Sequence, residues 1–445
     1  MTSDHPRVIV VGGGPAGLTA AHALHLAGIE FVVLERRATL IEDLGASLVL
    51  AAPSLRVMHQ FGLLDDLLAV GMELNHTKSF DFDGRVLNDS TGIQTVGKNH
   101  GMAPVAFHRA QLIDTIYNGL PKVAKAKVFF GKKVSKIQSD KLGVKVGCDD
   151  GSTYEGAIVI AADGVHSKTR QLMRSLALQS DPSRPWDPEQ PFTSSYKCLW
   201  CSFPRPSESG QSFDTQHKDK CVMYITGRER AWIFLYQKLP KPTQDRVSYT
   251  IDDIEAFVDE FKDFPVNDNL KVRDVWANKL TAGMSNLEEG VAKRWSWGRT
   301  VLVGDAAHKF TPNAGLGFNN GIQDVVMLCN GIRDLFTAVP QPDRPQLSSL
   351  EELFDKYQAE RTSRVREDAG RSAHVTRIQA WANPLYYITA KYVVTVKFFE
   401  YFMMEFLVKR SMQKALVLNY VHVEEPMKGA VAWHHPLNAA VEREG

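Results

Sequence analysis

The chain has 445 residues, 44% of them hydrophobic, and a formal net charge of +1. A chain of this length and apolar content buries a large core in two domains or more. Its near-neutral charge creates no global field for nucleic acid, so no nucleic-acid partner is expected. Five cysteines, an odd number, make no complete disulfide framework and indicate a reducing compartment, the cytoplasm. The first expected strand begins at Arg7, which leaves no room for a signal peptide.

A glycine-rich turn follows the first predicted strand. Residues 7–11 form an apolar, β-branched run that is typical of a buried parallel strand. Gly12 then allows a sharp turn, Gly14 lets backbone N–H groups approach a pyrophosphate, and Gly17 lets the next helix pack closely. That helix, expected over 16–27, directs its positive N-terminus at the phosphates.

The second predicted strand, 31–34, ends in a carboxylate. Glu35 lies 18 residues after Gly17, close to the spacing of an acid that binds ribose hydroxyls. The alternative is a glycine-rich turn without a ligand. Because strand, turn, helix, strand and acid all occur in register, we expect a dinucleotide-binding unit.

Two further motifs follow predicted buried strands much later in the chain. The strand over 159–162 leads into the first of them, and the strand over 300–303 leads into the second. A helix over 318–336 is expected after the last motif. The two motifs are 162–167, with Arg170 just after it, and 304–308, which runs on to Pro312, Gly315 and Gly317.

The three motifs together resemble those of the single-component flavoprotein monooxygenases, the family of the para-hydroxybenzoate and salicylate hydroxylases. The resemblance covers most of residues 7–370. It is closest to fungal FAD-dependent monooxygenases and epoxidases of meroterpenoid, indole-diterpene and polyene pathways, through residues 35–37, 45–47, 107–112 and 295–299. Val49 and Phe318 depart from the family pattern, in which a glycine and a small residue are common. The cofactor contacts that the resemblance implies are Gly12, Gly14, Gly17, Glu35, Arg36, Ala46, Val49, Arg109, Asp163, Gly164, Asp305, Pro312, Gly315, Gly317 and Phe318.

The fold that the resemblance implies is α/β. It consists of a Rossmann-like (GR2-type) FAD-binding domain, an inserted β-sheet substrate domain and C-terminal helices. The segment after about residue 186 agrees with this, because it is β-rich, aromatic and broken by Pro, Ser and Gly loops. The expected boundaries are 1–75, 101–185 and 295–370 for the FAD-binding domain, 76–100 and 186–294 for the substrate domain, and 371–445 for the helical region.

The resemblance also implies the reaction. FAD is the resident cofactor, NADPH or NADH is a transient reductant, and O2 is the co-substrate. One oxygen atom enters the product through a flavin C4a-hydroperoxide, and epoxidation of an alkene in a lipophilic terpenoid or polyketide is the first expectation. Hydroxylation of an aromatic ring is the alternative. Two alternatives outside the monooxygenases stay open: a flavin oxidase or dehydrogenase, and a protein with a degenerate flavin site.

Side chains for catalysis are harder to assign from the sequence. Tyr196 and Lys197 lie on a strand that resembles the family's substrate-facing strand, where a Tyr donates a proton and a Lys stabilises a developing anion. The alternative is an ordinary strand pair. Cys198 and Cys201 match a CxxC pattern, but residues three apart on a strand point to opposite faces, so no metal site is expected.

The segment after residue 371 is predicted to be helical and apolar. Charged residues interrupt it at short spacing, so no run approaches the roughly 20 apolar residues of a membrane-spanning helix. One interpretation is a helical cap over the substrate domain. The other is peripheral membrane contact through 383–408, where a lipophilic substrate would be collected. The sequence leaves the oligomeric state open.

Overall fold

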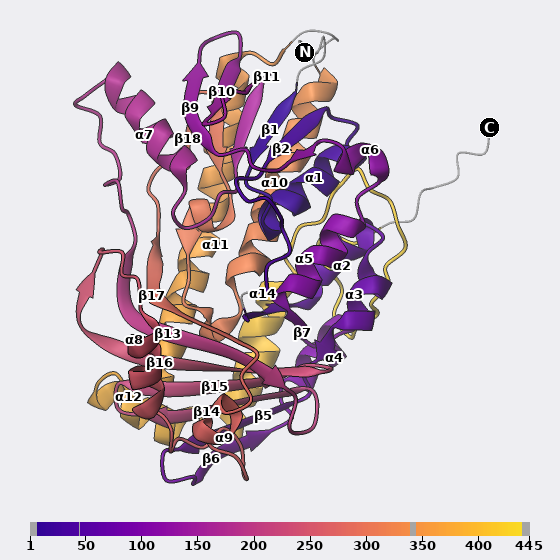
Figure 1. Ribbon diagram of the computed structural model, residues 1–445. Coiled ribbons are helices and arrows are strands. Elements are labelled where there is room, and N and C mark those ends of the chain that lie inside the picture. The colour runs from indigo at the N-terminus through magenta and orange to yellow at the C-terminus, as the bar shows by residue number, and fades with distance from the viewer. Residues whose placement is uncertain (1–6, 44, 339–343, 438–445) are drawn as a thin grey trace.

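The computed structural model describes residues 7–43, 45–338 and 344–437. Two large sheets lie at opposite ends of the molecule, and the long helix α11 (Leu347–Gln379) runs between them (Figure 1). The upper sheet in this view carries β1 and β2, and the lower sheet carries β13 to β16 with β5 and β6.

The upper sheet is built on the first predicted strand. Its order is β18-β19-β12-β1-β2-β8, and β1 pairs in parallel with both β2 and β12. The central strands are buried on both faces, which explains their continuous apolar sequences: helices cover one face, and strands within residues 134–148 cover most of the other. The strands are β1 (Val8–Val11), β2 (Phe31–Leu34), β8 (Val128–Phe129), β12 (Ile158–Ala161), β18 (Ser296–Trp297) and β19 (Thr300–Leu302), and the helices α1 (Pro15–Leu26) and α10 (Gly317–Ala338) pack against each other beside them.

Two three-stranded sheets and several helices complete this part of the molecule. One sheet has the order β11-β10-β9 and the other β3-β7-β4. Their members are β3 (Ser47–Leu50), β4 (Met72–Glu73), β7 (Val105–His108), β9 (Val134–Ser139), β10 (Val144–Cys148) and β11 (Thr153–Gly156), with helices α2 (Ala52–Gln60), α3 (Leu64–Val70), α4 (Gln94–His100), α5 (Arg109–Asn118), α6 (Lys122–Lys125) and α7 (Lys168–Ser180).

The lower sheet has eight strands in the order β20-β17-β13-β16-β15-β14-β5-β6. One face packs on helices α8 (Ile251–Asp259) and α9 (Val272–Trp276), and the other packs toward β3 and β7. We call the second the inner face. The strands are β5 (His76–Asp81), β6 (Val86–Ser90), β13 (Thr193–Pro204), β14 (Gln211–His217), β15 (Lys220–Thr226), β16 (Arg230–Thr243), β17 (Thr281–Val291) and β20 (His308–Lys309).

The C-terminal region differs from the helical region expected over 371–445. Residue 371 lies inside α11, and the helical turns end at Met412. Residues 413–437, which we call the C-terminal strap, form no helix, because side chains of α2 satisfy part of their backbone: Gln60 bonds the backbone of Leu418 and Val421. Residues 438–445 of that expectation lie outside the described residues. The short elements before the strap are α12 (Pro384–Ile388), η3 (Thr389–Val393), α13 (Lys397–Phe402), η4 (Met403–Val408) and α14 (Lys409–Met412).

Candidate cofactor and active site

The glycine turn has the geometry that a phosphate-binding loop requires. Gly12 has a φ of +103°, and a Cβ added to it would lie 2.5 Å from the carbonyl oxygen of Ala162. A Cβ at Gly17 would overlap the carbonyl oxygen of Gly12. A Cβ at Gly14, in contrast, would meet no atom within 4 Å. Gly14 is also the N-cap of α1 and offers no side-chain cap, so the helix N-terminus stays open to an anion.

Glu35 lies at the end of β2, beside the glycine turn. Its carboxylate is 7% exposed and accepts hydrogen bonds from the backbone N–H of Gly13, at 2.6 Å, and of Arg37, at 2.9 Å. The acid therefore holds the shape of the turn. A carboxylate has about four acceptor positions, so two remain for ribose hydroxyls.

Arg109 is the first residue of α5 and places a partly buried positive charge in the site. Its backbone N–H donates to the carbonyl oxygen of Ala46, but its guanidinium makes no hydrogen bond or ion pair with any described residue. Burial lowers the pKa of Arg109, the charge of Arg37 lowers it further, and Asp305 raises it. A partly buried cation without a partner is costly, and a phosphate or a flavin oxygen would compensate it.

The third motif forms a tight loop between β19 and α10. Gly304 has a φ of +57° and begins the short turn η1 (Gly304–Ala306). Asp305 is partly exposed and forms an ion pair with Lys309. A Cβ at Gly317 would lie 3.9 Å from the Asp305 carboxylate, so the start of α10 and this acid face the same space.

A buried ionic cluster fixes this loop from behind. Asp324 of α10 accepts the backbone N–H of Gly304 at 2.9 Å, the Nε2 of His308 at 2.6 Å and the Nε of Arg361 at 2.7 Å. Burial alone would raise the pKa of Asp324, but His308 and Arg361 hold it below its usual value. His308 is fully buried and serves this cluster. The sequence analysis missed Asp324 and Arg361, although an acid among the apolar residues of a buried helix was an available signal.

The polar side chains of the second motif mainly form hydrogen bonds within the protein. Asp163 accepts the hydroxyl of Ser167, at 2.5 Å, and the backbone N–H of Thr169, at 2.9 Å, so both carboxylate oxygens serve the start of α7. Gly164 has a φ of +83° and open space at its Cβ position. Arg170 then donates to the carbonyl oxygen of Ala306 and links the second motif to the third.

Asn319, which the sequence analysis also missed, joins the last loop to β3. Its amide oxygen accepts the backbone N–H of Ala51 at 3.0 Å, and its amide nitrogen donates to the carbonyl oxygens of Val49 and Gly315. Val49 therefore lies against Gly315. The remaining predicted contacts are Arg36, which is exposed, Pro312, which starts η2 (Pro312–Ala314), and Phe318, which packs partly buried on the main core.

These residues fit FAD. An open helix N-terminus, a glycine with free space above it and an unpaired guanidinium suit a pyrophosphate, and the carboxylates of Glu35 and Asp305 suit hydroxyl-bearing groups at either side.

Tyr196 and Lys197 separate onto opposite faces of β13. Tyr196 shares the inner face with Cys198; its side chain is 1% exposed, and its buried hydroxyl has no hydrogen-bond partner among the described residues. Lys197 instead lies over the ring of Phe257 in α8, 4.5 Å from its centre. Lys197 therefore lies on the face opposite Tyr196, away from the inner face, where it was expected to stabilise a developing anion. Cys198 and Cys201 divide between the two faces in the way that was expected.

The inner face is mainly apolar and aromatic, and it bears one carboxyl group that the sequence analysis did not identify. Asp214 of β14 lies opposite Met223 and accepts Ser79 and Gln216, each at 2.8 Å. Burial raises the pKa of Asp214. The apolar residues of this face that cluster with Leu74 and with Ala106 of β7 are Cys198, Cys221, Met223, Ile225, Trp232, Phe234 and Tyr236.

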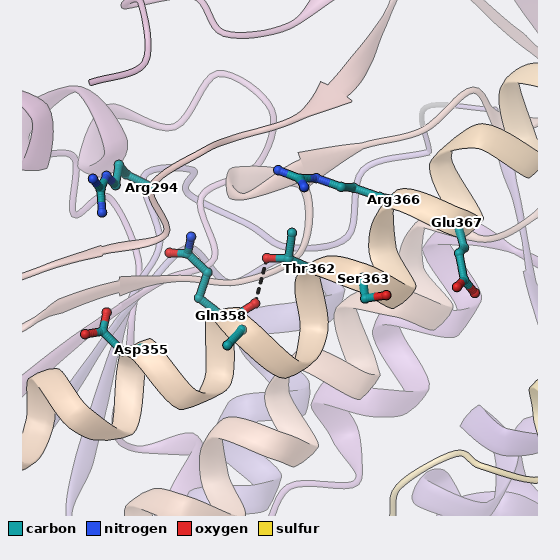
Figure 2. Close-up of a pocket in the computed structure, with 8 residues that line it drawn as sticks. Arg294, Asp355, Gln358, Thr362, Ser363, Arg366 and Glu367 are labelled. Atoms are coloured by element: carbon teal, nitrogen blue, oxygen red, sulfur yellow. Dashed lines mark hydrogen bonds between the residues drawn. The ribbon is translucent and has the colours of Figure 1, made fainter. Parts of the chain in front are cut away.

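An open hollow of about 750 Å³ lies elsewhere, along α11 (Figure 2). Arg294 faces Gln358 and Thr362 across it, and Asp355 and Glu367 lie at its two ends. None of the predicted cofactor contacts lines it, and its mixed charges favour no particular ligand.

Comparison with known proteins supports FAD as the cofactor. A family model described as an FAD binding domain matches residues 5–372. FAD-dependent monooxygenase prhF of Penicillium brasilianum is 32% identical over 393 residues, covering 87% of this chain and 82% of that protein. FAD-dependent monooxygenase SAT1 of Stachybotrys chartarum is 45% identical over 222 residues, covering 49% of this chain and 74% of that protein.

Solved structures show the same fold. The p-nitrophenol 4-monooxygenase PnpA from Pseudomonas putida superposes with a TM-score of 0.72 at 18% identity, covering 93% of this chain and 97% of that one. A salicylate hydroxylase in a substrate complex gives 0.67 at 16% identity, covering 93% and 98%. From the family match, the identity to the fungal proteins and the geometry of the site, the chain belongs to the FAD-binding-domain family and is an FAD-dependent monooxygenase.

Proposed function

We propose that the enzyme uses NADPH or NADH and O2 to epoxidise an alkene of a lipophilic terpenoid or polyketide of fungal secondary metabolism. The observation that carries the proposal is the inner face, because seven of its buried apolar or aromatic side chains cluster with Leu74 and with Ala106 of β7. Such a face favours an apolar substrate. FAD, when bound, accepts electrons from the nicotinamide and activates O2.

The chain's own residues bind, orient and exclude water. Arg109 and the N-terminus of α1 would hold the pyrophosphate, and Glu35 and Asp305 would hold the hydroxyl-bearing groups. The apolar inner face keeps water away from the reacting carbon atoms.

Tyr196 is the residue that we propose as a hydrogen-bond donor to the O2-derived oxygen atom that leaves as water when the other atom enters the alkene. Within the part of the chain that the structure describes, its hydroxyl has no hydrogen-bond partner, and its ring lies 6.0 Å from the guanidinium of Arg377. Because the side chain is 1% exposed, this role requires the sheet and α11 to separate locally when substrate binds. Tyr196→Phe should lower kcat by about 10²-fold while FAD occupancy is unchanged. Tyr224→Phe, on the opposite face, is the matched control; equal losses in both variants would remove Tyr196 from the reaction.

Hydroxylation of an electron-rich aromatic ring is the second candidate. Phe234 and Tyr236 stack on the inner face with ring centres 6.4 Å apart, and their π faces suit an aromatic substrate. The product distinguishes the two candidates: an epoxide would identify the first, and a hydroxylated aromatic ring would identify the second.

The deciding experiment measures nicotinamide oxidation and the fate of both atoms of O2. The FAD-loaded enzyme is given NADPH or NADH, a panel of lipophilic polyenes and phenols, and labelled dioxygen. We expect substrate to accelerate nicotinamide oxidation, one labelled atom to enter an epoxide, and the other to leave as water. Hydrogen peroxide as the sole fate of O2 would identify an oxidase and refute the proposal.

We further propose that the enzyme works in the cytoplasm. All five cysteines are buried and free, as a reducing compartment favours. Among the described residues, no helix combines the length and the apolar character needed to cross a bilayer.

A further inference from the structure

Apolar side chains are exposed in one short segment after α11. Among the described residues, nineteen large hydrophobic side chains are exposed, and ten of them lie between residues 385 and 407. Phe398 is 76% exposed and Leu385 is 70% exposed. Patches of this kind mark contacts with another surface. The ten are Leu385, Ile388, Tyr392, Val393, Val396, Phe398, Tyr401, Phe402, Phe406 and Leu407.

The segment contributes almost nothing to the core of the protein. Within α12, η3, α13, η4 and α14, Ala390 is the one buried residue. A helical cap over the substrate domain would bury its apolar face. The exposed apolar side chains therefore need a different partner.

The charges of the segment are sorted between its two sides. Both acids turn toward the protein: Glu400 accepts the hydroxyl of Ser90 at 2.6 Å, and Glu405 accepts Asn99 at 3.2 Å. The cations Lys397 and Arg410 stay exposed. An apolar surface with tyrosines and exposed cations matches the boundary of an anionic bilayer.

A second copy of the chain is a poorer match. A two-fold contact places the same patch on both subunits, so the cations of one segment would face those of the other. The acids that would neutralise them are already engaged within their own chain.

We propose that residues 385–410 form a docking surface for a membrane that contains anionic lipids. The surface lies on the bilayer and does not cross it, because its helices are short and interrupted. Ser90 ends β6 of the substrate sheet, and Lys238 of β16 donates to the carbonyl oxygen of Ala382. Docking would thus bring the substrate sheet to the lipid, from which a lipophilic molecule is taken up. In Figure 1, α12 and α14 mark the two ends of the surface.

Vesicle co-sedimentation of the FAD-loaded enzyme, without substrate, tests the proposal. We expect binding to phosphatidylcholine vesicles that contain phosphatidylserine. Replacing two exposed rings, in the Phe398→Ser/Tyr401→Ser variant, should weaken binding at least about tenfold, because less apolar surface enters the bilayer. The Lys397→Gln/Arg410→Gln variant should weaken it about fivefold per cation removed, and mainly for the anionic vesicles.

Matched variants control for nonspecific binding of the protein to vesicles. Leu142 is 78% exposed in the turn between β9 and β10, so Leu142→Ser removes a comparable apolar side chain elsewhere. Lys241→Gln removes an exposed cation from β16. Both should bind vesicles like the parent, and all variants should keep their FAD.

Three results would overturn the proposal. The first is an enzyme that binds neither kind of vesicle. The second is binding that the ring and cation variants leave unchanged. The third is a dimer, seen by sedimentation velocity without lipid, that the Phe398→Ser/Tyr401→Ser variant dissociates, because the surface would then belong to a second copy. None of these depends on which substrate the enzyme oxidises.

Discussion

At the scale of single residues, the three glycines of the first motif do different work. Gly12 and Gly17 are required by the chain itself, since a Cβ at either would meet backbone atoms. Gly14 is required only by a ligand, since the space above it is free. Its φ of −69° is one that alanine adopts readily.

Gly14→Ala should therefore separate folding from cofactor binding. We expect the apoprotein to lose less than about 1 kcal/mol of unfolding free energy, the cost of a poorer N-cap. The FAD dissociation constant should rise at least about tenfold, because the added methyl group occupies the place of the pyrophosphate. Urea unfolding and flavin fluorescence titration measure the two effects. Gly12→Ala is the control, and it should fail to fold stably.

Arg109 offers the complementary test. Its guanidinium has no partner among the described residues, so Arg109→Met should leave the stability of the apoprotein unchanged or raise it by about 1 kcal/mol. FAD binding should weaken by about 1.5–3 kcal/mol, the range for hydrogen bonds to a charged group. Arg37→Met, which removes a surface ion pair with Glu42, is the control for stability. An Arg109→Met protein that binds FAD as tightly as the parent would contradict the assignment.

At the scale of elements, α10 anchors the loop of the third motif through one carboxylate. The carboxylate of Asp324 accepts hydrogen bonds from the backbone N–H of Gly304, which follows β19, from the ring of His308 and from the guanidinium of Arg361 in α11. The loop that bears Asp305 is thus positioned by two helices packed against each other.

Asp324→Asn should destabilise the protein by about 3–5 kcal/mol at neutral pH, because it leaves the buried guanidinium of Arg361 without its counter-charge. The folded-state pKa of Asp324 lies below its unfolded value, so its contribution is present above about pH 4 and lost as the pH falls lower. Urea unfolding at several pH values measures this. Asp334→Asn, on the exposed side of the same helix, should have little effect. Equal stability of the two variants would show that the cluster is not anchoring the loop.

At the scale of the whole molecule, two buried histidines join distant parts of the chain. His22 of α1 bonds the carbonyl oxygen of Ile116 in α5 at 2.8 Å and stacks on Phe61. His100 of α4 packs against Trp433 of the C-terminal strap. Burial is the main cause that lowers the pKa of each to about 4.

The protein should therefore lose stability in mild acid. Since both folded-state values lie below the usual 6.5, the unfolded chain binds more protons between about pH 6.5 and pH 4. Stability is complete above this window and falls through it, by about 2 kcal/mol per histidine at pH 5. His22→Gln keeps a donor for Ile116 and should remove about 2 kcal/mol of the loss between pH 7 and pH 5. An unchanged loss in urea unfolding would refute the assignment.

The local pattern of the sequence was sufficient for the glycine turn and the two strands beside it. The strands that end at Val11 and Leu34, and the glycine turn between them, were predictable because the tight turn and the buried parallel strands depend on residues close together in the chain. The helix after Gly17 and the carboxylate of Glu35 were predictable for the same reason.

Other features depend on contacts between residues far apart, and only the tertiary structure decided them. Alternation along β13 separates Tyr196 from Lys197, but which of the two faces the cofactor side depends on tertiary packing: α8 covers the face that bears Lys197. The residues after Met412 leave the helical pattern because α2, more than 300 residues earlier, supplies hydrogen bonds to their backbone. The sequence by itself determined which cofactor the fold can bind, since each of the three motifs that indicate FAD is a short run of neighbouring residues; which side chains meet at the inner face depended on long-range packing, which no local pattern encodes.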